Sequence, residues 1–393
     1  MASLGSKQLL FFLYVSMFMV TFSVGIYNPL IPLYAKILGA TYTDLGIIGM
    51  VFAFPYAVLP VFVGSLTDRF GRKPFYMGGV LFSAITTILF VFASRVEDII
   101  LIRVFNGIAY SFLWPVAEPI IADITPPHER TKVMGRFSFS WALGFLLSPF
   151  FGGVIVENFG FHPLFITAMI LGLGASLIAF YGLIYKQNNK FKKKDVLKEK
   201  KFNVKNNGIA NSFNSLFSVY LVIVVYSIVV GIIFSIFPVY ANSFGVTSFQ
   251  IGMLFTIFGI TRVIVFLNSE NVSKIFGEKN SIILALIIQI TSLTLMASVR
   301  SLLSFMFSMA LLGLTVGIIS PITLSLASKI ARKGKVGATL GSMESLFGLG
   351  MTVGPLIGGI VAENVSIETP YIVAGLLSFL PLTILVKEKI RKT

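Results

Sequence analysis

The sequence predicts an all-α polytopic membrane protein with twelve transmembrane helices, arranged as two pseudo-symmetric six-helix bundles. Composition, segmentation and an internal repeat lead to this prediction. Hydrophobic residues make up 56% of the 393 positions and charged residues 12%, whereas a soluble domain carries about 25% charged residues. One core cannot hide so much apolar surface, so lipid must be the solvent for much of the chain.

Twelve apolar segments are each long enough to cross a bilayer, which takes about 20 residues. The first follows Lys7 and is too long for a signal-peptide core, so we expect it to be a retained helix. The expected spans lie near 8–37, 43–67, 75–95, 98–124, 132–156 and 163–186, and then near 213–242, 248–269, 280–299, 301–328, 337–362 and 370–387.

Positive charge is concentrated on one side of the predicted membrane. The net charge is +15, and most of the 31 Lys and Arg residues fall in alternate loops and in the stretch 186–205. This asymmetry predicts a cell-membrane protein with both termini in the cytoplasm. We interpret the basic stretch as a linker that sets topology rather than as a nucleic-acid or anionic-lipid patch. The predicted domains are therefore 1–186, a cytoplasmic linker at 187–211, and 212–393.

The two halves repeat each other at a spacing of 206 residues. Pro32 and Tyr34 correspond to Pro238 and Tyr240, and glycine and proline positions in further segments coincide in the same register. Each half has six predicted helices, an even number, so both halves have the same orientation. They are parallel repeats related by an axis along the membrane normal.

Several motifs along the chain belong to one known pattern. The loop Gly64–Lys73 reads GSLTDRFGRK, the fourth span contains Arg103-x-x-Asn106-Gly107, and glycine/proline blocks occupy the fifth and eleventh spans. In this order the motifs resemble the major facilitator superfamily, most closely its 12-helix drug:proton antiporters. The resemblance covers nearly the whole chain.

The resemblance implies a conformational latch in the loop after the second span. It implies that Asp68 accepts hydrogen bonds from the start of the eleventh helix near Gly337, because helix N-termini expose N–H groups, and that Asp123 pairs with Arg72. The alternative is a basic turn that only sets topology. In the second copy of the loop, Lys274 replaces the aspartate, so we expect a weaker latch there. The predicted latch residues are Asp68, Arg69, Gly71, Arg72, Lys73 and Asp123.

The glycine/proline blocks let helix backbones approach closely, as small residues do in membrane interfaces. In the family these helices lie near the interface between the halves; the alternative is general close packing without a functional role. The predicted helix-packing residues are Gly144, Pro149, Gly153, Gly350, Gly354, Pro355 and Gly359.

Four ionisable residues lie inside predicted spans: Arg103, Glu118, Arg262 and Glu344. Each costs about 2.5–3.5 kcal/mol in mid-membrane, so each should face the protein interior. Arg262 and Glu344 are equally deep, about 10 Å from the inner boundary at 1.5 Å per residue, which predicts that they pair with each other. Glu118 is a candidate proton carrier or, alternatively, a structural partner of Arg136.

Residues at helical spacing on the fourth span should form one face toward the cavity that the family lines with its first, fourth, seventh and tenth helices. Asn28 stands where several drug antiporters carry an acid in the first helix. The predicted substrate and proton pathway comprises Asn28, Arg103, Asn106, Tyr110, Trp114, Glu118, Arg262 and Glu344.

These features predict a monomeric secondary active transporter that works by alternating access, with a small-molecule substrate, protons as the coupling ion and the lipid bilayer as its surroundings. Proton-coupled export of drug-like or amphipathic molecules is the leading interpretation. The alternatives are uptake or exchange of a metabolite such as an organic anion or sugar, and a membrane sensor or enzyme. The sequence has no cysteine, phosphate loop or metal-ligand cluster, so we expect no enzyme activity, cofactor, metal or nucleic-acid partner.

Overall fold

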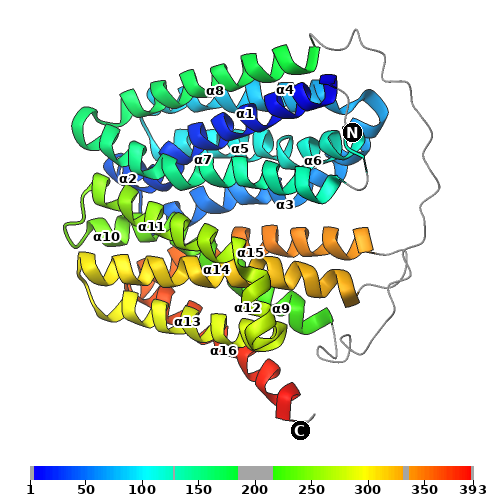
Figure 1. Cartoon of the computed structure of the whole chain (residues 1–393). Helices are drawn as coiled ribbons and strands as arrows, with labels where there is room; N and C mark the ends of the chain where they lie inside the picture. The colour runs from blue at the N-terminus through cyan, green and yellow to red at the C-terminus, as the bar shows by residue number, and fades with distance from the viewer. Residues whose placement is uncertain (1–3, 127–128, 185–215, 331–335, 391–393) are drawn as a thin grey trace.

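The computed structural model describes residues 4–126, 129–184, 216–330 and 336–390. Within these ranges the regular structure is entirely helical, and twelve helices or helix pairs are long and apolar enough to cross a membrane. Figure 1 shows them running roughly parallel to one another. The predicted all-α fold with twelve spans is confirmed. The predicted linker, 187–211, lies outside the described residues, so the domain boundaries stay predictions.

Two of the first six spans are interrupted near prolines. Pro29 and Pro32 interrupt the first span, and Pro115 follows a break at Leu113 in the fourth, because proline has no N–H to donate within a helix. The elements are α1 (Leu4–Tyr27), η1 (Asn28–Leu30), α2 (Ile31–Ile37), α3 (Tyr42–Phe70), α4 (Arg72–Ile88), η2 (Leu89–Phe92), α5 (Val96–Ser111), α6 (Trp114–Ile124), α7 (Arg130–Phe159) and α8 (Phe161–Ile184).

The last six spans repeat the first of these breaks, whereas the tenth span is one continuous helix. Pro238 begins a short helix after the seventh span, as Pro32 does after the first. The elements are α9 (Leu216–Ser235), α10 (Phe237–Asn242), α11 (Ser248–Leu267), α12 (Ser269–Phe276), α13 (Glu278–Ser298), α14 (Leu302–Ile330), α15 (Val336–Asn364) and α16 (Thr369–Ile390).

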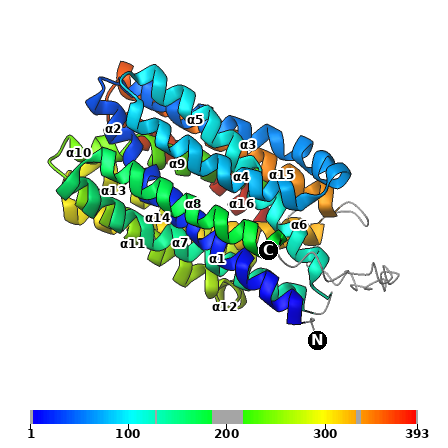
Figure 2. The ribbon, with the colours of Figure 1, turned by 90° about the horizontal axis from the view of Figure 1, so that it is seen from above.

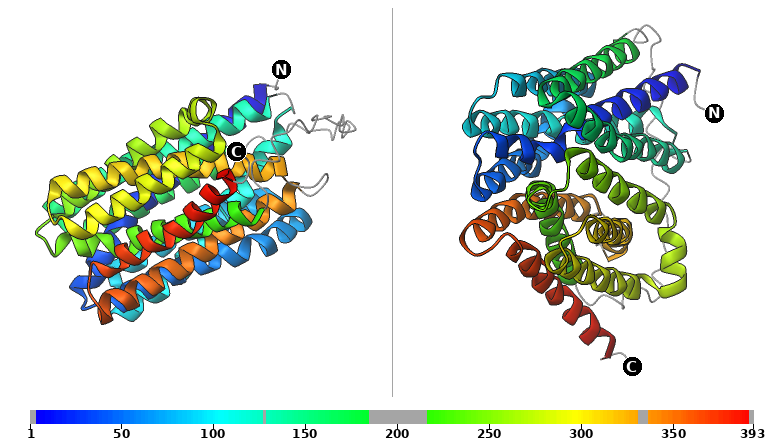
Figure 3. Two further views of the ribbon diagram at one scale, coloured as in Figure 1. Left: turned by 90° about the horizontal axis from the view of Figure 1, so that it is seen from below. Right: turned by 90° about the vertical axis from the view of Figure 1, so that its left-hand side faces the viewer.

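The spans form two bundles that lie side by side. In Figure 1 α1 to α8 occupy the upper bundle and α9 to α16 the lower one, and the same separation is visible in the right-hand view of Figure 3. Two helix pairs carry most of the contact between the bundles: α3 with α15, and α7 with α11. Figure 2 shows α3 and α15 along one side of the molecule.

The two bundles repeat each other in their hydrogen bonds. The hydroxyl of Tyr34 donates to the Phe90 carbonyl at 3.1 Å, and the hydroxyl of Tyr240 donates to the Met296 carbonyl at 2.9 Å. Donor and acceptor are displaced by the same 206 residues between the two bonds. The pseudo-symmetry predicted from the repeat therefore extends to individual buried contacts.

Large apolar side chains cover the outside of the bundles. Phe92 and Leu303 are each 75% exposed, while Met17, Tyr76 and Phe305 are fully buried within the bundles. Since water would disfavour so much exposed apolar surface, this outer face is suited to lipid. Helix-to-helix packing inside each bundle forms the core.

Candidate functional site

Glycines bring the two bundles into backbone contact at one end, which we call the sealed end. A Cβ atom on Gly46 of α3 would lie 2.5 Å from the Pro355 carbonyl oxygen of α15. A Cβ atom on Gly252 of α11 would meet the Pro149 carbonyl oxygen of α7 still more closely. Any larger side chain would have to displace backbone. The predicted helix-packing prolines thus lie at the interface between the bundles.

Two glutamates tie the sealed end together across the same helix pairs. The Glu363 carboxylate at the end of α15 accepts a 2.7 Å hydrogen bond from the Tyr42 N–H at the start of α3. The Glu157 carboxylate at the end of α7 accepts one of 3.3 Å from the Phe249 N–H near the start of α11. Each carboxylate caps a helix N-terminus of the other bundle. Our sequence interpretation missed this pair, although its 206-residue spacing was available as a signal.

At the opposite end, which we call the loop end, the bundles part. Gly64 lies on α3 and Gly341 on α15, the two helices that touch at Gly46. A Cβ atom on either glycine would meet nothing within 4 Å. Between these extremes Gly348 still lies against Ala57. The bundles are therefore in backbone contact at the sealed end, whereas Gly64 and Gly341 of the same helix pair face open space at the loop end.

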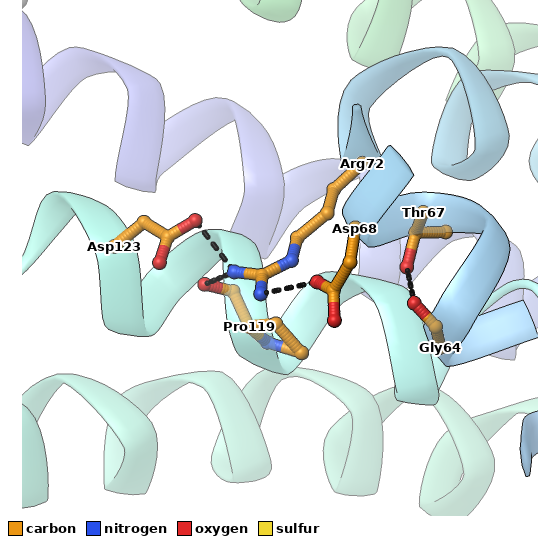
Figure 4. Close-up of polar contacts among 6 residues, drawn as sticks. All are labelled: Gly64, Thr67, Asp68, Arg72, Pro119 and Asp123. Carbon is orange, nitrogen blue, oxygen red and sulfur yellow. Dashed lines mark hydrogen bonds and ion pairs between the residues drawn. The ribbon is translucent and has the colours of Figure 1, made fainter. Parts of the chain in front are cut away.

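The loop end of the first bundle carries the Asp68 cluster, made of Asp68, Arg72 and Asp123. Arg72 lies between the two carboxylates, with its Nη2 2.9 Å from Asp68 and its Nη1 2.6 Å from Asp123 (Figure 4). Nη1 also donates to the Pro119 carbonyl at 3.2 Å. The expected contact between Arg72 and Asp123 is thus present, and it joins α4 to α6.

The other predicted latch residues do not join this cluster. The Arg69 guanidinium lies over the Phe70 ring, and the Lys73 ammonium donates to the Leu183 carbonyl of α8. Gly71 has φ +90°, a value that strains any residue with a side chain, and it ends α3. The predicted contact of Asp68 with the start of the eleventh span involves residues 331–338, whose side chains lie outside the described part of the chain.

The second bundle carries charges of opposite sign at the equivalent positions, with one pairing changed. Lys274, Glu278 and Lys329 stand at the positions of Asp68, Arg72 and Asp123 in the repeat. Lys329 lies 2.6 Å from Glu278, and Lys274 lies 2.7 Å from Glu270. The hydrogen bond and charge of Lys274 lower the pKa of Glu270 below its ordinary value. We call these four residues the Glu278 cluster; the sequence interpretation noted only Lys274.

Arg103 is a buried charge in the middle of the first bundle. It is 5% exposed, its Nη1 donates to the Asn28 side-chain oxygen at 2.9 Å, and its guanidinium lies 3.9 Å from the centre of the Phe52 ring. Its Nε has no hydrogen-bond partner. Asn106, one turn further, is turned inward instead and donates to Thr86.

A row of aromatic rings leads from Arg103 to the other bundle. Successive ring centres lie 5.1, 5.2 and 6.2 Å apart, and Arg262 of α11 lies over the last ring at 5.7 Å. All four rings belong to the first bundle, so the row leads up to the interface, with a guanidinium of the first bundle at one end and one of the second bundle at the other. Its rings, in order, belong to Phe52, Tyr110, Trp114 and Trp141.

Glu118 of α6 and Glu344 of α15 are carboxylates of opposite bundles that lie within electrostatic range of each other. Both side chains are exposed, and their carboxylates interact electrostatically with each other and with the Tyr56 hydroxyl of α3. Within the described part of the chain, neither carboxylate has a hydrogen bond or ion pair. The break at Leu113 separates α5, which carries Arg103 and Tyr110, from α6, which carries Trp114 and Glu118, so the single continuous face predicted for the fourth span is divided between two helices.

The predicted pairing of Arg262 with Glu344 is wrong. Among the described residues these two side chains form no ion pair; Arg262 lies over Trp141, and Tyr226 interacts electrostatically with both charges. The prediction compared depths only. Because α11 packs against α7 while α15 packs against α3, the two helices present these side chains to different neighbours.

The remaining predicted packing residues lie at close helix contacts. A Cβ atom on Gly144 or Gly350 would collide with a hydroxyl, that of Thr21 or of Ser227 respectively. Those two hydroxyl residues are again 206 positions apart. A Cβ atom on Gly354 would lie 2.5 Å from the Ile228 carbonyl oxygen, and Gly153 and Gly359 approach the first residues of α11 and α3.

The whole-chain comparison agrees with this architecture. Residues 13–225 and 219–391 match the Major Facilitator Superfamily. The chain belongs to this superfamily of transporters. It is 28% identical to an uncharacterized MFS-type transporter of Methanocaldococcus jannaschii, over 94% of this chain and 97% of that protein. It is 27% identical to multidrug resistance protein 2 of Bacillus subtilis, over 98% and 97% of the two chains.

A solved structure of the superfamily has the same fold. The inward-facing, occupied structure of a bacterial homolog of the human lysosomal transporter Spinster superposes with a TM-score of 0.76, covering 97% of this chain and 96% of that one at 14% identity. The resemblance inferred from the motifs is confirmed at the level of family and fold.

Proposed function

We propose that this superfamily member exports amphipathic small molecules in exchange for protons, as a monomer working by alternating access. Positive charge concentrated in alternate loops favours a cytoplasmic loop end, so that the open end of the interface faces the cytoplasm. The relatives support export of foreign compounds, since that of Bacillus subtilis is named a multidrug resistance protein.

The observation that carries the proposal is the electrostatic interaction between Glu118 and Glu344, which belong to opposite bundles. When both are ionised, their repulsion opposes closure of the loop end, because closure brings like charges together in a medium that screens them poorly. Protonation of either carboxylate, or a substrate with a positively charged group, removes this repulsion. The empty, ionised protein therefore stays open, and each change of state requires protons or substrate, which is the condition for exchange.

The Asp68 and Glu278 clusters support the same cycle. Each links helices within one bundle through an ion pair, so each holds its loop in a fixed shape while the bundles move as units. The loop ends of the two bundles then meet in the outward-facing state and lie apart in the inward-facing state.

Reconstituted protein in liposomes with an imposed pH gradient tests the proposal. A fluorescent amphipathic cation should accumulate against its gradient, and Glu118→Gln or Glu344→Gln should reduce gradient-driven flux by about 5- to 150-fold while substrate exchange without a gradient persists. Glu97→Gln, a change of the same kind at an exposed position, is the control. Undiminished gradient-driven transport by both variants would refute the proposal.

Organic-anion uptake or exchange is a second candidate function. It is favoured by Arg103, which has a neutral partner in Asn28 rather than a carboxylate. The same liposomes distinguish it, since uptake would move an organic anion in the direction of proton flow rather than against it.

A further inference from the structure

Arg103 lacks a counter-charge within the described residues. Its hydrogen bond goes to the neutral amide of Asn28, its Nε is unpartnered, and its electrostatic neighbours are the hydroxyls of Tyr27 and Tyr110. A charge that is 5% exposed without a counter-ion is strongly disfavoured. The site is therefore incomplete until an anion approaches it.

The surroundings indicate what kind of molecule would bring that anion. Phe52 and Tyr110 lie next to the guanidinium, and Trp114 and Trp141 extend the row up to the interface, where Arg262 of the other bundle lies over Trp141. Flat aromatic molecules stack on such rings. Glu118 lies on the same helix as Trp114, one turn further, and its carboxylate has no partner among the described residues, so a positive group would be favoured at that end.

We infer that the transported molecules are aromatic zwitterions, whose carboxylate or similar anionic group binds Arg103 and whose positive group approaches Glu118 and Glu344. This inference rests on the proposed transport function and names the substrate class of the same site. The Asn28 side chain is the selective element: being neutral, it orients the guanidinium without cancelling its charge, so the substrate supplies the counter-ion.

Replacing Asn28 by aspartate tests this directly. The change is nearly isosteric and puts a carboxylate at hydrogen-bond distance from Arg103, so it should serve as an internal counter-ion and displace the anionic group of the substrate. Asn28→Leu, of similar size, removes the hydrogen bond without adding charge. It should leave the preference for anionic groups in place.

The two tryptophans of the chain, Trp114 and Trp141, both lie in the aromatic row, so their fluorescence reports on this site alone. Quenching is titrated on purified protein in detergent with rhodamine B, which carries a carboxylate, and with its methyl ester. The natural sequence should bind the acid about tenfold more tightly than the ester. Asn28→Asp should abolish that preference by weakening acid binding, with ester binding unchanged within about twofold.

Three results would overturn the inference: equal binding of acid and ester by the natural sequence, no effect of Asn28→Asp, or the same loss in Asn28→Asp and Asn28→Leu. The first needs no variant, so a folding defect cannot obscure the answer. Because the assay has no pH gradient, it is independent of proton coupling. Failure of gradient-driven flux with retained acid preference would reject only the proposed function.

Discussion

The two bundles agree in their packing and differ in their chemistry. Tyr34 and Tyr240 donate to equivalent carbonyls, but Met309 stands at the position of Arg103, and Phe234 stands at that of Asn28. A seal between two bundles needs matching surfaces, so its contacts occur in pairs. A binding site at the interface needs each polar group only once, so the repeat places no constraint on it.

The loop-end clusters show a second kind of difference. The Asp68 cluster has two acids around one base, whereas Glu278 has lysines at the corresponding positions. Both clusters join the same equivalent helices. Both clusters have opposite charges across the contact between their helices. The sign at each position differs between the two clusters.

The largest effect is expected where the symmetric seal is disturbed. Gly46→Ala or Gly252→Ala places a methyl group against a backbone carbonyl of the other bundle, a clash of about 1–3 kcal/mol. Transport should fall by about 5- to 150-fold as the sealed end is forced apart. Distances between spin labels across that end measure the opening. Gly64→Ala and Gly341→Ala are the controls, because these glycines face open space. Unchanged transport and unchanged label distances in both Gly46→Ala and Gly252→Ala would contradict this account.

A smaller effect is expected from reversing charge in the Asp68 cluster. Arg72→Glu gathers three carboxylates, and because Asp68 and Asp123 are 67% and 64% exposed, we expect a cost of about 1 kcal/mol, or roughly fivefold in transport rate. Adding Asp68→Lys and Asp123→Lys reproduces the pattern of the second bundle and should restore most of the rate. If the triple variant transports no faster than Arg72→Glu alone, the sign of the charge at each position matters as well as its pairing.

The smallest effect is expected from the paired tyrosines. Tyr34→Phe and Tyr240→Phe each remove a buried hydrogen bond worth about 1 kcal/mol, which should lower Tm by about 2 °C without changing transport. Thermal unfolding of purified protein measures this. The Tyr34 hydroxyl also donates to the Ala93 carbonyl, so Tyr34→Phe should lower Tm at least as much as Tyr240→Phe. A reduced transport rate in either variant would assign the tyrosines more than a packing role.

Much of the molecule could be read from local patterns. The twelve spans and the placement of the basic loops follow from residues close together in the chain, because membrane crossing depends on the length and polarity of each segment alone. The repeat follows from comparing the sequence with itself. The contact between Arg72 and Asp123 was expected through family resemblance, since the motif residues occupy the matching positions.

Other features depend on how helices are turned against each other. Helical rise gives the depth of Arg262 and Glu344, but neither rise nor period tells which neighbour a side chain meets. Packing of α11 on α7 directs Arg262 to Trp141, and the break at Leu113 divides the face predicted for the fourth span between α5 and α6. The depth of a residue depends on its own helix alone. The direction in which its side chain points around the helix axis is set by all the helices that pack against it. The neighbours of the site residues could therefore be seen only in the tertiary structure.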